Sequence, residues 1–364
     1  METITKILEK WYCQNKRDLP WRKTKLAYEI WLSEIILQQT RVNQGIQYYI
    51  RFLDRFPDVH QLAQASLEEV LKTWQGLGYY TRARNLHATA RKIVHQYNGL
   101  LPADYNMLLS LPGIGEYTAA AIASIAFDIP VALVDGNVFR VLARLFGIRT
   151  PITSPGGKKE IQSLAESILN KRKPGIHNQA LMELGAMICL PRNPSCGNCP
   201  VVSVCFACRH NQINELPVRV VNVKIKRRYF HYLHITWSGK LFIQQRKQKD
   251  IWNSLYEFPL IETQRAVKPD KLSGHVKWRQ LLRGTPYLVQ HISPLYKHQL
   301  SHQTLYARFY SIEVREVPSA LAEDYTCIQE DKIYDYPVSR LTEKYLTTYI
   351  PIKNIKDQRV PDET

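Results

Sequence analysis

The sequence predicts a multidomain protein in which a mainly α-helical domain is followed by a smaller α/β domain. The chain has 364 residues, which is enough to bury two separate hydrophobic cores. Residues 111–138 have the pattern of two helices joined by a short turn that contains two glycines. From about Arg227 onward, apolar and polar residues alternate with the period of two that is typical of β-strands.

Charge and hydropathy restrict the class of partner. The formal net charge is +17 and the isoelectric point is about 9.5. Residues 1–218 and residues 219–364 are both basic, so the excess does not come from a detachable tail. This charge favours a polyanionic partner. No apolar run approaches the roughly 18 residues that cross a membrane. The N-terminus also lacks an apolar signal-peptide region, so we expect a cytoplasmic protein, or one of the bacterial nucleoid.

One carboxyl group near the N-terminus lies among apolar residues. The first helix is followed by a loop with Arg17, Trp21 and Arg22, which either packs a base or covers an edge of the core. Residues 30–42 predict a helix in which Glu34 lies within an apolar stretch. A glutamate on the solvent face would have no special role. A glutamate that its neighbours desolvate has a raised pKa and can act as a general acid near neutral pH.

Two short segments carry side chains suited to a nucleic acid. Gln38, Gln39 and Thr40 are uncharged hydrogen-bonding groups that suit the place left by a displaced base. Residues 77–84, LGYYTRAR, put two tyrosines beside two arginines. Aromatic rings stack on bases and arginines hold phosphates. The alternative for this second segment is the start of a helix with a tyrosine pair in the core.

The turn between the two predicted helices suits a phosphate group. Gly113 and Gly115 allow backbone N–H groups to face outward at the start of a helix. An ordinary tight turn would look the same, but Asp135 follows an apolar run about twenty residues later and stands beside a glycine. A hairpin that binds a DNA backbone, followed by an aspartate, resembles the helix-hairpin-helix DNA glycosylase superfamily.

Four cysteines lie close together in the sequence, at the spacing Cys-x6-Cys-x2-Cys-x5-Cys. They are Cys189, Cys196, Cys199 and Cys205. Disulfides are rare in large cytosolic proteins, and zinc ribbons favour two Cys-x2-Cys pairs far apart. The spacing suits a [4Fe–4S] cluster and matches that of the endonuclease III and MutY-type glycosylases, with zinc or free thiols as the alternatives.

The second half of the chain divides into three parts. Residues 209–226 are polar and then rich in valine, which predicts an interdomain linker after a helical domain of residues 1–208. Residues 227–350 contain the predicted strands, with a hairpin turn at Ser238-Gly239. Residues 351–364 are polar and predict a disordered tail.

The C-terminal domain resembles a Nudix domain in part. Residues 252–259, WNSLYEFP, are similar to the start of such a domain. However, only Glu257 precedes a stretch in which the REx2EE pattern of magnesium-binding Nudix hydrolases does not occur. We therefore expect a Nudix-like domain without pyrophosphohydrolase activity. Within it, Ser301 and His302 predict a loop or turn that can reach a nucleotide.

Together these motifs resemble the adenine DNA glycosylases of the MutY type, which are helix-hairpin-helix enzymes with an iron–sulfur cluster. The resemblance covers nearly the whole chain. It implies a monomeric base-excision repair enzyme that flips out and removes adenine mispaired with 8-oxoguanine or guanine in double-stranded DNA. It also implies a [4Fe–4S] cofactor on the four clustered cysteines. Cleaving the N-glycosidic bond requires an acid at the base and a carboxylate at the sugar.

The resemblance implies a role for each residue that matches the family. The residues at the reacting bond are Glu34 as the acid, Asp135 at the sugar cation, and Tyr117 and Asn137 beside them. The residues expected around the adenine are Gln179, Arg17, Trp21 and Arg22. The residues expected on the DNA and at the lesion are Gln38, Gln39, Thr40, Leu77, Tyr79, Gly113, Gly115, Ser301 and His302. One departure is Leu300, where the family usually has an aromatic residue.

Two other functions stay open at this point. A glycosylase–lyase similar to endonuclease III would need a lysine as Schiff-base nucleophile. The endonuclease III pattern LPGxGxK has that lysine where this chain has Tyr117, which favours a monofunctional hydrolase. A non-catalytic DNA-binding or iron–sulfur sensor protein would use the hairpin, the cysteines and the basic charge. It would have no need of Glu34 and Asp135.

Overall fold

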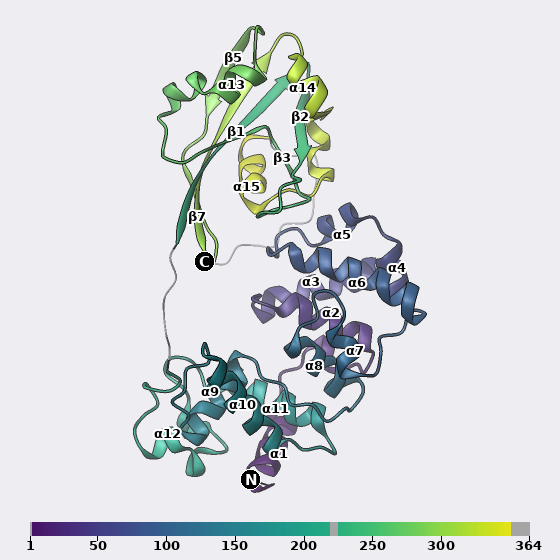
Figure 1. Ribbon diagram of the computed structural model, residues 1–364, viewed down its shortest axis with the longest axis vertical. Coiled ribbons are helices and arrows are strands. Elements are labelled where there is room, and N and C mark those ends of the chain that lie inside the picture. The colour runs from purple at the N-terminus through teal and green to yellow at the C-terminus, as the bar shows by residue number, and fades with distance from the viewer. Residues whose placement is uncertain (1, 219–224, 351–364) are drawn as a thin grey trace. The chain divides into compact units, whose positions relative to one another are not determined.

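The structure is a computed structural model that describes residues 2–218 and 225–350 (Figure 1). Contacts divide these residues into two compact units. The first consists of residues 2–65 and 84–218, and the second adds residues 66–83 to the C-terminal part. The first unit is helical and the second combines a sheet with helices, which confirms the predicted fold class. None of the helices in the described part of the chain combines the length and apolarity that crossing a bilayer requires.

The first unit is built from helices with short connections. Their bounds are α1 (Glu2–Asn15), η1 (Pro20–Arg22), α2 (Ala27–Leu37), α3 (Val42–Arg55), α4 (Val59–Gln64), α6 (Thr81–Tyr97), α7 (Tyr105–Leu109), α8 (Glu116–Ala126), α9 (Gly136–Phe146), α10 (Pro155–Ile168), α11 (Pro174–Met187), η2 (Cys196–Asn198), η3 (Val202–Val204) and α12 (Phe206–Arg209). Every residue of α2 from Ile30 to Ile36 is buried, and so is every residue of α8 from Thr118 to Ile125. Helices buried on all sides form the centre of a helical domain. The alanines of α8 let α2 and α11 pack closely against it.

The predicted hairpin joins α7 to α8 and is held by α6. Gly113 has a φ of +75°, and a Cβ atom there would lie 2.5 Å from the Cβ of Asn85, so this position requires glycine. The hydroxyl of Thr89 donates a hydrogen bond to the carbonyl of Pro112 at 2.6 Å. Gly115 is the N-cap residue of α8. The hairpin therefore has a fixed conformation and leads directly into α8.

The second unit contains an eight-stranded sheet with β1 and β7 at its centre. The strands are β1 (Lys226–Trp237), β2 (Lys240–Gln245), β3 (Tyr256–Glu257), β4 (Leu260–Thr263), β5 (Tyr287–Ile292), β6 (Tyr296–Gln299), β7 (Gln303–Val314) and β8 (Thr326–Gln329). β1 and β7 pair in parallel from Lys226–Gln303 to Thr236–Glu313. The predicted hairpin turn joins β1 to β2, with positive φ angles of 47° at Ser238 and 74° at Gly239. Two positive φ angles are what a type I′ turn requires.

Both faces of this sheet carry a hydrophobic core. The helical elements are η4 (Pro269–Gly274), α13 (Val276–Leu281), α14 (Ser319–Asp324), η5 (Glu330–Asp335) and α15 (Arg340–Tyr349). Tyr232 of β1 belongs to the core that includes Tyr345 of α15. The next residue, Leu233, belongs to the core that includes Trp278 of α13 and Leu321 of α14. The alternation of side chains along the strand therefore fills both layers.

The contacts differ from the predicted domain bounds at two places. Residues 66–83, which contain α5 (Leu67–Thr73), belong to the second unit although the sequence interpretation put them in the first domain. The predicted linker begins at residue 209, but Leu216 is 1% exposed and its carbonyl accepts a hydrogen bond from Arg144 Nε at 2.9 Å. Residues 219–224 of the linker and the predicted tail lie outside the described residues. The domain bounds therefore stay a prediction.

Candidate active site

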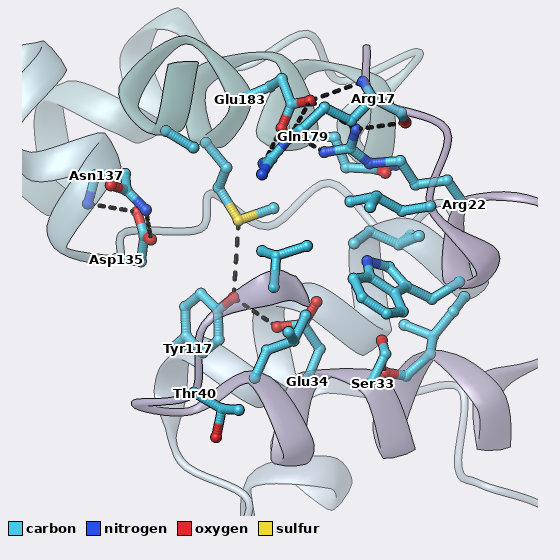
Figure 2. Close-up of a pocket in the computed structure, with 18 residues that line it drawn as sticks. Arg17, Arg22, Ser33, Glu34, Thr40, Tyr117, Asp135, Asn137, Gln179 and Glu183 are labelled. Carbon is cyan, nitrogen blue, oxygen red and sulfur yellow. Dashed lines mark hydrogen bonds and ion pairs between the residues drawn. The ribbon is translucent and has the colours of Figure 1, made fainter. Parts of the chain in front are cut away.

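A pocket of about 240 Å³ lies among α2, α8, α11 and the start of α9, all within the first unit. Nine of the predicted site residues line it. They are Arg17, Trp21, Arg22, Glu34, Thr40, Tyr117, Asp135, Asn137 and Gln179. Figure 2 shows Glu34 and Tyr117 on one side, Asp135 and Asn137 on a second, and the arginines with Glu183 on a third. The pocket is smaller than the roughly 300–1,000 Å³ of drug-sized sites, and it has room for a small ligand such as a single base.

Glu34 lies on α2 and is 7% exposed. Burial raises the pKa of its carboxyl group to about 7. The Tyr117 hydroxyl donates a hydrogen bond to Glu34 Oε2 at 2.5 Å, which acts in the opposite direction. The charge of Asp135 raises the pKa further, and that of Arg22 lowers it. Glu34 is therefore a carboxyl group that can hold a proton near neutral pH.

Asp135 stands at the start of α9 as its N-cap residue. Its Oδ1 accepts hydrogen bonds from the backbone N–H groups of Asn137 at 2.9 Å and Val138 at 2.7 Å. The Asn137 side-chain amide donates to Oδ2 at 2.8 Å. Burial raises the pKa of Asp135, while these donors and Arg140 act to lower it. Three N–H donors at a helix N-terminus favour the ionised form and oppose the effect of burial, although the pKa stays raised overall.

Tyr117 lies in the first turn of α8, directly after the hairpin. Besides its bond to Glu34, its hydroxyl lies 3.7 Å from the sulfur of Met182 on α11. Burial raises the pKa of Tyr117 well above the usual range, so its hydroxyl keeps its proton and donates. Tyr117 thereby joins the acid residue on α2 to the wall formed by α11.

Glu183 of α11 is a buried site residue that the sequence analysis did not identify. Its carboxylate accepts hydrogen bonds from both Arg17 and Arg22, with Nη2–Oε2 distances of 2.6 Å in each case. Burial acts to raise the pKa of Glu183, but the hydrogen bonds from Arg22 and Arg17 outweigh it and lower the pKa to about 2. The two arginines are therefore fixed by one shared carboxylate. Like Glu34, this glutamate lies in an apolar helical stretch, which was the available signal.

Three further predicted residues, Gln38, Gln39 and Thr40, directly follow the C-terminal end of α2. Gln38 Nε2 donates a hydrogen bond to Thr118 Oγ1 at 3.2 Å. Gln39 has a positive φ of 58°, which is uncommon for a residue other than glycine. Thr40 lines the pocket, whereas Gln38 and Gln39 are not among its described lining residues.

Four of the residues predicted to contact the DNA or the lesion belong to the second unit. Leu77 is 8% exposed and Tyr79 is 48% exposed. Ser301 and His302 are exposed and lie in the turn between β6 and β7, and the hydroxyls of Tyr79 and Ser301 are hydrogen-bonded. Leu300 packs against the sheet core. The structure thus brings together two residues that are 222 positions apart in the chain.

The four clustered cysteines line one small cavity of about 30 Å³ in the first unit. Cys208, which makes a second Cys-x2-Cys pair with Cys205, lines the same cavity. Arg144 Nη1 lies 3.4 Å from Cys189 Sγ. Several thiols facing an otherwise apolar cavity are a donor set that fits an iron–sulfur cluster. Within the described residues, no group of three His, Cys, Asp or Glu side chains is placed to hold a single metal ion.

Comparisons with known families agree with this architecture. The family described as "HhH-GPD superfamily base excision DNA repair protein" matches residues 32–171, and the NUDIX domain family matches residues 231–348. A solved structure of a thermostable thymine-DNA glycosylase has a TM-score of 0.52 and 29% sequence identity. The matched region covers 57% of this chain and 96% of the thymine-DNA glycosylase chain. Fold and site together define a helix-hairpin-helix DNA glycosylase with a NUDIX domain.

Curated relatives narrow the family. The adenine DNA glycosylase of Buchnera aphidicola subsp. Schizaphis graminum is 33% identical over 300 residues, which is 80% of this chain and 86% of the relative. The adenine DNA glycosylase of Mus musculus is 46% identical over 221 residues, which is 57% of this chain and 43% of the relative. The chain belongs to the adenine DNA glycosylase family.

Proposed function

We propose that this protein hydrolyses the N-glycosidic bond of adenine mispaired with 8-oxoguanine or guanine in double-stranded DNA. The observation that carries the proposal is the pair of carboxyl groups, Glu34 and Asp135, in one base-sized pocket. The relatives named as adenine DNA glycosylases support adenine as the base. The net charge of +17 supports DNA as the partner. We also propose that the protein acts as a monomer on chromosomal DNA in the cytoplasm.

In the mechanism that we propose, adenine is flipped out of the duplex into the pocket, at a cost of a few kcal/mol. Glu34 donates its proton to N7 of adenine, which makes the base a neutral leaving group. Asp135, held by the N-terminus of α9, stabilises the positive charge that develops on the sugar. Tyr117 and Asn137 orient the two carboxyl groups through the bonds described above. Water then forms a bond to C1′ of the sugar cation, and its proton passes to the Glu34 carboxylate, which restores the acid.

Several other residues support the binding of DNA in this proposal. Arg17, Arg22, Trp21 and Gln179 surround the base in the pocket. The hairpin with Gly113 and Gly115 contacts a phosphate through backbone N–H groups. The residues assigned to the vacated space and the lesion are Gln38, Gln39, Thr40, Leu77, Tyr79, Ser301 and His302. The hydrogen bond between Tyr79 and Ser301 supports a shared role for those two residues.

We propose that Cys189, Cys196, Cys199 and Cys205 hold a [4Fe–4S] cluster, because these thiols line one cavity. When bound, such a cluster would link the four cysteines to one another and so hold the loop that carries them in one conformation. Arg144 of α9 also holds this loop, because its guanidinium donates a hydrogen bond to the carbonyl of Leu190 at 2.7 Å. The cysteine loop is therefore tied to the helix that begins at Asp135.

Incubation of the protein with end-labelled duplexes containing adenine opposite 8-oxoguanine, with and without alkali, tests this function. We expect strand scission only after alkali, because the described pocket lining includes Tyr117 but no lysine to form a Schiff base. Scission without alkali would contradict the hydrolase and indicate a lyase. No reaction by protein that binds the duplex would favour the non-catalytic DNA-binding function.

A further inference from the structure

Tyr12 of α1 contacts a pocket residue without being among the described residues that line the pocket. Its side chain is 3% exposed, and its hydroxyl donates a hydrogen bond to Gln179 Oε1 at 2.9 Å. Burial raises the pKa of Tyr12, so the hydroxyl keeps its proton at neutral pH. The hydroxyl therefore donates to the carbonyl end of the Gln179 amide; if the amide turned, the hydroxyl could accept from Nε2, but its own proton would lose this acceptor.

A second contact requires the same orientation of this amide. Gln179 Nε2 donates a hydrogen bond to the backbone carbonyl of Gly175 at 3.2 Å. If the amide turned by 180°, Gln179 Oε1 would lie against the Gly175 oxygen, and two acceptors would repel each other. Tyr12 and Gly175 therefore favour one of the two amide orientations.

The ring that carries the Tyr12 hydroxyl is itself held by charged neighbours. The guanidinium carbon of Arg22 lies 5.5 Å from the ring centroid, and Lys16 Nζ lies 5.7 Å from it. At the other end of α1, Thr5 Oγ1 donates to the carbonyl of Ile168 at 3.1 Å. The hydroxyl is thus presented to Gln179 from a fixed helix.

We propose that Tyr12 is a positioning residue that fixes the order of donor and acceptor on Gln179 and so selects a 6-aminopurine over a 6-oxopurine. The proposal rests on the proposed function. After its bonds to Tyr12 and Gly175, the amide retains one N–H and one oxygen lone pair. Adenine presents a ring-nitrogen acceptor beside an amino donor, the pattern that a glutamine amide matches with two hydrogen bonds. Hypoxanthine has a carbonyl in place of that amino group and mismatches the fixed amide.

The test compares single-turnover excision of adenine, unsubstituted purine and hypoxanthine, each opposite 8-oxoguanine. Tyr12→Phe removes the hydrogen bond that favours one orientation of the Gln179 amide. We expect it to lower the ratio of the adenine rate to the hypoxanthine rate by about tenfold. The rate for purine, which has no group at position 6, should change least. A fall in all three rates by one common factor would overturn the proposal, since a merely structural role predicts that result.

Three further variants separate a positioning role from a general loss of stability. Tyr28→Phe is the matched control, because the Tyr28 hydroxyl donates to the carbonyl of Phe56 at 2.6 Å and Tyr28 is not among the described pocket residues. It should leave the rate ratio unchanged. Gln179→Leu should lower the ratio by itself, and adding Tyr12→Phe to that variant should lower it no further. A second, additive fall would overturn the proposal, because Tyr12 would then act without Gln179.

Binding measurements separate this proposal from the proposed function. In a Glu34→Gln background, the dissociation constants for the adenine and hypoxanthine duplexes report base preference without excision. If the wild type fails to excise adenine, the proposed function fails. A binding ratio that falls with Tyr12→Phe would still support the positioning role. An unchanged binding ratio would overturn that role, whatever the wild type excises.

Discussion

Glu34 and Asp135 are two buried carboxyl groups in one pocket that differ in their hydrogen-bond donors. Burial is the largest influence on each and raises both pKa values, to about 7 in Glu34. From residues that the structure describes, Asp135 accepts three hydrogen bonds from N–H donors, whereas Glu34 accepts one, from the Tyr117 hydroxyl. Two carboxyl groups held in this way can serve at one pH as the acid and as the anion.

The pH dependence of excision follows from the pKa of Glu34, about 7. Glu34 is protonated and active as an acid below that pH, so the single-turnover rate should fall about tenfold per pH unit above it. Tyr117→Phe removes a hydrogen bond that lowers the pKa of Glu34, so the fall should begin at a higher pH. A rate that stays constant or rises from pH 7 to 9 would contradict Glu34 as the acid.

At the scale of residues, the local sequence pattern identified the two carboxyl groups of the pocket but not the contacts between residues far apart in the chain. Glu34 interrupts an apolar run, and Asp135 ends one and stands beside a glycine. Both residues line the pocket. Glu183 gave a similar signal within α11, but its two arginine partners are more than 160 positions away in the chain. Tyr12 and Gln179 are 167 positions apart. No local pattern encodes a contact of that range.

At the scale of elements, α5 and the loop after it fold with the C-terminal part of the chain. Lys72 Nζ donates to the backbone carbonyl of Tyr334. Gln75 donates to Glu343 Oε1 at 3.1 Å and accepts from the Val338 N–H at 3.4 Å. These bonds precede Tyr79 by a few residues, so the C-terminal part supports the segment that carries Tyr79 toward Ser301.

Gln75→Leu should therefore weaken lesion discrimination without removing a proposed DNA contact. Each lost hydrogen bond is worth about 1 kcal/mol, so we expect a several-fold fall in preference for 8-oxoguanine over guanine opposite adenine. Single-turnover rates on the two duplexes measure this preference. Gln64→Leu, at an exposed glutamine of α4, is the matched control and should match the wild type. Equal discrimination by Gln75→Leu and the wild type would remove the supporting role.

At the scale of the whole molecule, the sequence patterns predicted a helical part followed by strands, and the partial resemblance to a Nudix domain implied that the second part is α/β. Both parts are present. The grouping of residues 66–83 with the second unit was not predicted. The sequence shows three apolar residues in and just after α5, and the structure buries all three, which are Val70, Leu71 and Trp74. Apolar residues alone do not specify which partner surface covers them. A truncation after residue 218 would remove this partner together with Ser301, so point variants are the cleaner test.

The central claim is that Glu34 supplies the proton that releases adenine. The most direct measurement compares wild type and Glu34→Gln for binding and single-turnover excision on a duplex with adenine opposite 8-oxoguanine. Glutamine keeps the size of the side chain but has no acidic proton. We predict similar dissociation constants and a rate lowered by about 10²–10⁴-fold, the usual contribution of a general acid. Comparable excision rates in the two proteins would contradict the claim.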